Sequence, residues 1–117
     1  MKPVELPQEL TEKLFEVIEI ARTSGKVKKG TNEVTKALEK GTAKIAVTAS
    51  DVQPQEVIMH LPLIGKEKGI PVVAVSSRQE LGASAGLTVP TASVAVTDAG
   101  DAKKQLDELA KKIKALE

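Results

Sequence analysis

Apolar residues recur every three or four positions near both ends of the chain, which is the spacing of an amphipathic helix. In residues 7–23 the apolar set is Leu10, Leu14, Val17, Ile18 and Ala21. In residues 101–116 it is Ala102, Leu106, Leu109, Ile113 and Leu116. Each pattern predicts a helix with one buried face, and Gly25 is a stop signal for the first helix.

Three shorter segments, 43–49, 70–75 and 93–96, are apolar almost throughout, as strands buried on both faces are. A short extended piece is expected at 26–30. Helices are predicted over 31–40 and 51–69, and Pro62 is expected to break or kink the second, since proline lacks a backbone donor. A further short helix is predicted after Ser77, because Ser77 and Glu80 fit a Ser-x-x-Glu capping box.

Strands that alternate with helices indicate an α/β protein, a three-layer α/β/α sandwich with helices on both faces of one sheet. We find no internal repeat, linker or low-complexity segment, so residues 1–117 are predicted to form a single domain. A chain of 117 residues is long enough for one real core.

Composition narrows the possible functions. The net charge is only +1, so a nucleic-acid partner would have to meet a local patch, and residues 26–44 supply one with six lysines against two glutamates. The absence of cysteine excludes disulfides and thiolate zinc sites. Phe15 is the only aromatic residue, so an RNA-binding surface here would have to work without stacking bases on aromatic rings. No apolar run is long enough to span a membrane, and a cytoplasmic location is expected.

Several residues suggest chemistry but have simpler interpretations. Ser84 lies in a Gly-x-Ser-x-Gly sequence, yet a helix precedes it and the only histidine comes earlier, so a helix end fits better than a serine hydrolase. His60 stands among apolar neighbours and is expected to be packed and hydrogen-bonded. Asp51 is interpreted as a cap for the helix that follows it. We predict no metal site and no cofactor.

The stretch KKGTNEVTK at 28–36 raises a sharper question. A helix over 31–40 turns Val34, Ala37 and Leu38 inward, which leaves Asn32, Glu33 and Lys36 together on the outer side of its first turn. This pattern is typical of a solvated helix start, with Thr31 as a cap and Glu33 favoured by the helix dipole.

The alternative is a recognition cluster that combines three chemistries: an amide that donates and accepts, a carboxylate that accepts and an ammonium that donates. These groups complement the acceptors and donors of guanine. Side chains cannot reach the major groove of regular A-form RNA, so the target would be an RNA helix opened by non-Watson–Crick pairs or a sharp bend.

The segment GLTVP at 86–90 also allows two interpretations. Leu87, Val89 and Pro90 either are buried or extend the last strand, or they form an apolar loop tip that supports an extruded base without any aromatic ring.

Four segments together resemble a known family: residues 24–47, residues 51–62, EKGIPVVAV and ELGASAGLTVP. The family is that of the archaeal large-subunit ribosomal proteins of the L-seven-Ae type. It belongs to a kink-turn RNA-binding superfamily with the L-thirty-e protein and the core proteins of box C/D and H/ACA particles. The most specific part is Gly30–Lys36. The chain departs from familiar members at Ser50, where they carry glutamate, and lacks the tyrosines of their strand at 72–75.

The resemblance implies a small mixed four-stranded sheet, with KVKK as the extra strand, and binding to kink-turn RNA. Asn32, Glu33 and Lys36 would read the guanines of tandem sheared G·A pairs, and Lys28 and Lys29 would meet phosphate. A loop would cover the extruded nucleotide, with Val57 bordering the same pocket. The implied RNA-binding set is Lys28, Lys29, Gly30, Thr31, Asn32, Glu33, Lys36, Val57, Leu87, Thr88, Val89 and Pro90.

The sequence therefore favours a non-enzymatic, monomeric RNA-binding protein. Its expected partners are structured RNAs with kink-turns and other ribonucleoprotein core proteins, with ribosomal RNA, box C/D and H/ACA guide RNA and the RNA of ribonuclease P as candidate targets. Two alternatives stay open: a small serine hydrolase that uses Ser84, and a protein–protein scaffold that uses the helix at 101–116.

Overall fold

A mixed five-stranded sheet with the strand order β1-β4-β3-β5-β2 forms the centre of the protein in a computed structural model that describes residues 3–116. The strands are β1 (Val4–Glu5), β2 (Lys26–Lys29), β3 (Ile45–Ala49), β4 (Val72–Val75) and β5 (Ser93–Asp98). β1, β4 and β3 run parallel, whereas β5 is antiparallel to β3 and β2 is antiparallel to β5.

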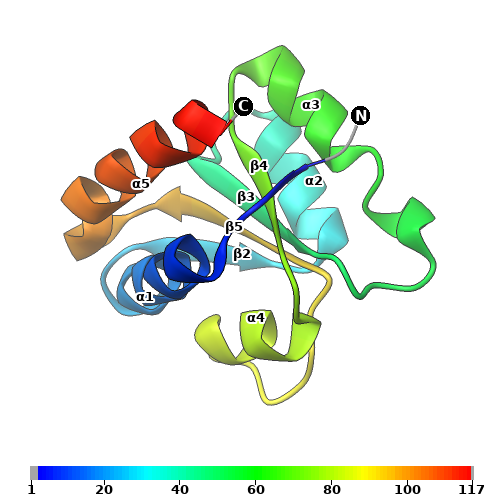
Figure 1. Cartoon of the computed structure of the whole chain (residues 1–117), viewed down its shortest axis with the longest axis horizontal. Coiled ribbons are helices and arrows are strands. Elements are labelled where there is room, and N and C mark those ends of the chain that lie inside the picture. Colours follow the sequence, from blue (N-terminus) through cyan, green and yellow to red (C-terminus); the bar gives the residue numbers. More distant parts are fainter. Residues whose placement is uncertain (1–2, 117) are drawn as a thin grey trace.

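Helices cover both faces of this sheet. The α-helices are α1 (Gln8–Ser24), α2 (Thr31–Glu39), α3 (Leu61–Lys68), α4 (Arg78–Ser84) and α5 (Lys103–Leu116), and two short 3-10 helices are η1 (Gln55–Val57) and η2 (Gly100–Ala102). Figure 1 shows α1 and α5 on one side of the sheet and α2 and α3 on the other, with α4 next to α1. This arrangement confirms the predicted α/β/α sandwich.

The core lies where the apolar patterns predict it. All residues of β3 and β4 are buried, as the continuous apolar runs indicate. The predicted inner faces of α1 and α2 are buried in full. On α5 the prediction is wrong for Leu116, which is 47% exposed, because it lies in the last turn of the helix, beyond Ile113.

The sheet has one strand more than the four expected from the resemblance. KVKK forms β2 as expected, but β1 adds a fifth strand, pairing Val4 with Val73 and Glu5 with Ala74. Two residues are too few to show the alternation by which a strand is detected in a sequence.

The prediction of one helix over 51–69 that Pro62 breaks or kinks is wrong. This segment contains η1 and, after a break, α3. Pro62 is the second residue of α3 and lies in its first turn. Backbone N–H groups in that turn have no intrahelical partner, so proline starts this helix rather than breaking it.

α3 packs closely on the start of β4 through Gly65, which is buried. A Cβ atom at this position would overlap Cγ2 of Val72 and lie 2.8 Å from the carbonyl oxygen of Ile70. The missing side chain therefore sets the distance between α3 and the sheet.

We predict that Gly65→Ala destabilises the protein by about 1–3 kcal/mol, because the added methyl group overpacks this contact. Alanine normally stabilises a helix relative to glycine, so the sign of the effect is diagnostic. Urea unfolding measures it, with Glu67→Ala at an exposed position of α3 as the control. A stabilised Gly65→Ala variant would contradict the close packing.

Candidate nucleic-acid interface

The topology brings the two predicted recognition segments to one end of the sheet. β5 is antiparallel to both β3 and β2, so the start of β5 meets the ends of β2 and β3. Residues 30–36 follow the end of β2, and residues 87–90 precede β5. In Figure 1 this end of the sheet lies towards the lower right, between the start of α2 and the loop after α4.

Ser93, the fully buried first residue of β5, joins the two segments. Its carbonyl oxygen accepts the backbone N–H of Gly30 at 3.0 Å and the hydroxyl of Thr91 at 3.2 Å. Its own hydroxyl lies 3.2 Å from that of Thr31. One residue therefore anchors both the start of α2 and the end of the loop.

The first turn of α2 has no side-chain cap. The predicted cap, Thr31, is instead the first helical residue, and its hydroxyl is paired with Ser93. Gly30 holds the N-cap position with φ of 91°, a conformation that favours glycine. The first backbone hydrogen bond of α2 runs from the N–H of Val34 to the carbonyl of Gly30. The N–H groups of residues 31–33 therefore lack partners within the helix.

The outer side of the same turn carries the predicted cluster. Asn32, Glu33 and Lys36 are exposed, whereas Val34 is fully buried among the core residues. Burial of Val34 fixes the rotation of α2, and this rotation directs the three polar side chains towards water.

α2 is also fastened to α3 by a hydrogen bond that links Thr35 and His60. The hydroxyl of Thr35 donates to the carbonyl of Thr31 at 2.7 Å and lies 2.8 Å from Nε2 of His60. Since the hydroxyl proton is used on Thr31, Nε2 of His60 is assigned as a donor. His60 is thus hydrogen-bonded as predicted but exposed rather than packed, because it stands just before α3.

The predicted loop is an exposed turn rather than an extension of β5. Leu87 is half-buried, while Thr88, Val89 and Pro90 are exposed, Val89 to 60%. The loop folds back on α4: the N–H of Leu87 donates to the carbonyl of Gly82, and a Cβ atom on Gly82 would overlap the carbonyl oxygen of Val89.

The remaining predicted residues flank this end of the sheet. Lys28 and Lys29 are exposed on β2, opposite Ala95 and Val94 of β5. Val57 is 41% exposed in η1. The side-chain amide of Gln55 donates to the carbonyls of Ser50 and Val52 and so holds η1 to the segment that follows β3. These hydrogen bonds, which fix the position of η1 and hence of Val57, do not involve α2 or the loop at 87–90.

Asp51 was predicted to cap the helix directly after it, and this is wrong. Its carboxylate accepts the backbone N–H of Arg78 at 3.0 Å, at the start of α4. Ser77 caps the same helix, as predicted, by accepting the N–H of Glu80 at 3.1 Å. The start of α4 is therefore held to the end of β3.

The geometry disfavours both alternative functions. Ser84 is buried, and its hydroxyl donates to the carbonyl of Leu81 at 2.8 Å, so it is not presented to a substrate. On α5 the outer face is charged and exposed. There, the neighbouring Lys13 of α1 lowers the pKa of Lys112, while Glu108 opposes this shift.

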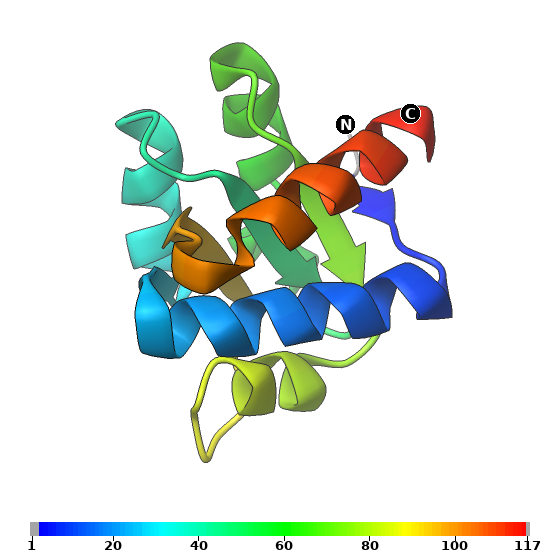
Figure 2. The same cartoon turned by 90° about the vertical axis from the view of Figure 1, so that its left-hand side faces the viewer.

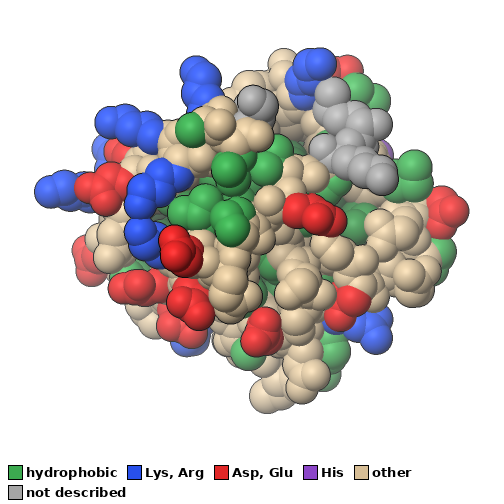
Figure 3. Space-filling view, in the orientation of Figure 1, with side chains coloured by type: hydrophobic (Ala, Val, Ile, Leu, Met, Phe, Trp, Pro, Cys, Tyr) green, Lys and Arg blue, Asp and Glu red, His purple; other side chains and the backbone are tan. Residues whose placement is uncertain are grey.

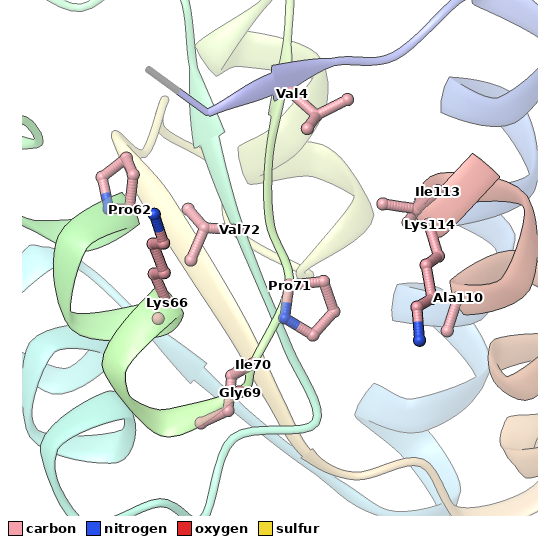
Figure 4. A pocket seen from close by; sticks show the side chains of 11 residues that line it. Val4, Pro62, Lys66, Gly69, Ile70, Pro71, Val72, Ala110, Ile113 and Lys114 are labelled. Atoms are coloured by element: carbon pink, nitrogen blue, oxygen red, sulfur yellow. The ribbon is translucent and has the colours of Figure 1, made fainter. Parts of the chain in front are cut away.

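A hollow of about 550 Å³ lies away from the predicted residues. It is found between α3 and α5, over the start of β4, which is the end of the sheet opposite to Ser93. Figure 4 shows Lys66 and Lys114 on opposite sides of Pro71 and Val72. No residue of the predicted RNA-binding set lines this hollow.

Sequence reasoning missed the contacts that hold the candidate interface together. Ser93 meets Thr31 across 62 positions, and His60 meets Thr35 across 25. Serine at the start of a strand carries no recognisable signal of such a pairing, so only the folded chain reveals it.

Comparison with known proteins agrees with this architecture. Residues 12–106 match the Ribosomal protein L7Ae/L30e/S12e/Gadd45 family, and the chain belongs to this family. Among solved structures it is similar to the "Giardia lamblia 15.5kD RNA binding protein", with a TM-score of 0.91 and 28% sequence identity, over 96% of this chain and 93% of that one. In the part of the chain that the structure describes, no helix has the length and apolar character needed to cross a membrane.

We predict that Ser93→Ala destabilises the protein by about 1 kcal/mol, because the hydroxyl of Thr31 loses its partner. Hydrogen exchange of the Gly30 amide should also become faster, since the start of α2 is held less firmly. Ser84→Ala is a matched control at a second buried serine, where the carbonyl of Leu81 keeps the N–H of Ala85 as its partner. Equal effects of the two substitutions on Gly30 would show that the hydroxyl of Ser93 does not help to hold the start of α2.

Proposed function

We propose that this protein is a non-enzymatic RNA-binding protein that recognises kink-turn motifs and stabilises their bent form. One observation carries the proposal: Asn32, Glu33 and Lys36 are exposed together on a helix turn that Ser93 ties to the loop at 87–90. Family membership and the similarity to an RNA-binding protein support it.

In this proposal the cluster on α2 reads purine edges. Lys36 and Asn32 donate to the N7 and O6 acceptors of guanine, and Glu33 accepts from guanine N–H groups. Tandem sheared G·A pairs in a sharply bent duplex expose these edges, whereas regular A-form RNA does not. The unpaired N–H groups of the first turn supply further donors for an RNA oxygen.

Charge favours the approach of RNA from this side. Lys28 and Lys29 are exposed on β2 directly before the cluster, where they can contact phosphate. Figure 3 shows acidic side chains gathered over α1, on the side of the sheet opposite to α2. A polyanion is therefore attracted to the lysines of β2 next to the cluster and not to the acidic surface of α1.

The loop supplies the apolar contact. We propose that Leu87, Thr88, Val89 and Pro90 cover a nucleotide that the bend extrudes, and that Val57 borders the same pocket. Because Phe15 is the only aromatic residue and is half-buried, this nucleotide would be held by aliphatic packing rather than by ring stacking.

Free kink-turn RNA can populate bent and extended forms, so a protein that binds only the bent form shifts the population towards it. We also propose that the chain acts as one domain and is monomeric when free. Its role would be an assembly factor for the large ribosomal subunit and for box C/D and H/ACA particles, with the RNA of ribonuclease P as a further target. The core proteins of these particles would be its protein partners.

We predict that Lys36→Ala weakens binding to a kink-turn with G·A pairs by about tenfold or more, or ~1.4 kcal/mol, because a base contact is lost. On a matched hairpin in which Watson–Crick pairs replace the G·A pairs, the loss should be much smaller. A gel shift at fixed salt measures both.

Lys104→Ala, which removes one positive charge from α5, is the control for net charge. If Lys36→Ala lowers affinity equally for both RNAs, direct reading of guanine is excluded. If wild-type protein binds both RNAs equally well, kink-turn recognition itself is excluded.

A further inference from the structure

Arg22, one of two arginines in the chain, lies against the start of the proposed RNA-binding loop. It is in the last turn of α1, and its side chain crosses Gly86. A Cβ atom on Gly86 would lie 2.6 Å from Cδ of Arg22 and 3.0 Å from both Nε and Nη1. Both the aliphatic part and the guanidinium of Arg22 therefore rest on the backbone at Gly86.

Gly86 is the point where the chain leaves α4 and enters the loop. Its φ of 81° is in the left-handed region, and its N–H donates to the carbonyl of Ala83 at 3.0 Å. The end of the loop is held elsewhere, by Thr91 on Ser93 and by the N–H of Thr91 on the carbonyl of Arg78. The contact with Arg22 thus lies at the end of the loop that Ser93 does not hold.

Arg22 meets the loop from the side away from the proposed guanine-reading cluster. Figure 2 shows the loop after α4 beneath the C-terminal end of α1, and Figure 1 shows α2 on the other side of the sheet. An RNA that contacts Asn32 and the tip at Val89 would therefore leave Arg22 behind the loop, where it supports the loop without touching a base.

We propose that Arg22 is a positioning residue that holds the loop at 87–90 in the conformation that receives RNA. This inference rests on the proposed function. At the loop tip the side chain of Val89 is 60% exposed, so side-chain packing contributes little to holding the tip in place. Without the contact between Arg22 and Gly86 the loop samples more conformations. The apparent affinity for RNA then falls in proportion to the fraction of molecules whose loop has the conformation that binds RNA.

The first test needs no RNA. Arg22→Ala should accelerate hydrogen exchange at the Leu87 amide, which donates to the carbonyl of Gly82 at 2.9 Å, measured by NMR on the free protein. The amide of Thr91, bonded to Arg78 at the other end of the loop, should keep its rate. Unchanged exchange at Leu87 would show that Arg22 does not brace the loop.

The second test measures binding to a G·A kink-turn. Arg22→Ala should raise the Kd about five- to tenfold, as expected if a fifth to a tenth of the loops stay competent. Arg22→Lys, which keeps the charge and most of the aliphatic chain, should recover part of the loss. Lys104→Ala controls for the change in net charge, and the thermal midpoint checks that each variant is folded.

Two further measurements separate positioning from direct contact. If Arg22 acts through the loop, its effect is not additive with that of Val89→Ala in a double-mutant cycle, and the salt dependence of binding keeps its slope. Additive effects, together with a slope reduced by about one, would mean that Arg22 contacts phosphate and would overturn the proposal. Wild-type protein that fails to bind the kink-turn would reject the proposed function, whereas wild-type affinity of Arg22→Ala would reject only the role of Arg22.

Discussion

The candidate interface depends on the hydrogen bonds of one buried residue at the start of β5. The carbonyl of Ser93 binds Gly30 and Thr91, and its hydroxyl meets Thr31, so the start of a helix and the end of a loop share a single anchor. Because β5 lies inside the sheet between β3 and β2, this anchor cannot move without disturbing the core. The two segments therefore keep a fixed separation although many residues divide them along the chain.

The division of α2 into two faces links stability to function. Its inner face, Val34, Ala37 and Leu38, belongs to the core, and its outer first turn carries Asn32, Glu33 and Lys36. Stable packing of the inner face holds the outer side chains in place before any ligand arrives, which reduces the entropy that binding must overcome. A surface almost without aromatic groups needs such preorganisation, because directional hydrogen bonds must supply what stacking would otherwise contribute.

Much of the fold could be predicted because it follows local periodicity. The buried faces of α1 and α2 and the continuous apolar runs of β3 and β4 were all evident from spacing, and the resemblance identified β2. The errors arose where a feature was too short or was decided by tertiary contact. β1 has only two residues. Pro62 lies in the first turn of α3, although its helix propensity alone predicts a break, and Asp51 accepts a hydrogen bond from the start of α4 instead of capping the segment directly after it. The contact partners of Ser93, His60 and Arg22 could not be predicted, because those partners lie far away in the sequence.

β2 forms one edge of the sheet, and no strand among residues 3–116 pairs with its outer backbone groups. Such an edge invites the addition of a strand from a second molecule and hence aggregation. Lys26, Lys28 and Lys29 are all exposed along it, so two copies that approach edge to edge would repel each other. The lysines proposed to meet phosphate would thus also keep the free protein from pairing with itself, a protection that weakens as ionic strength rises.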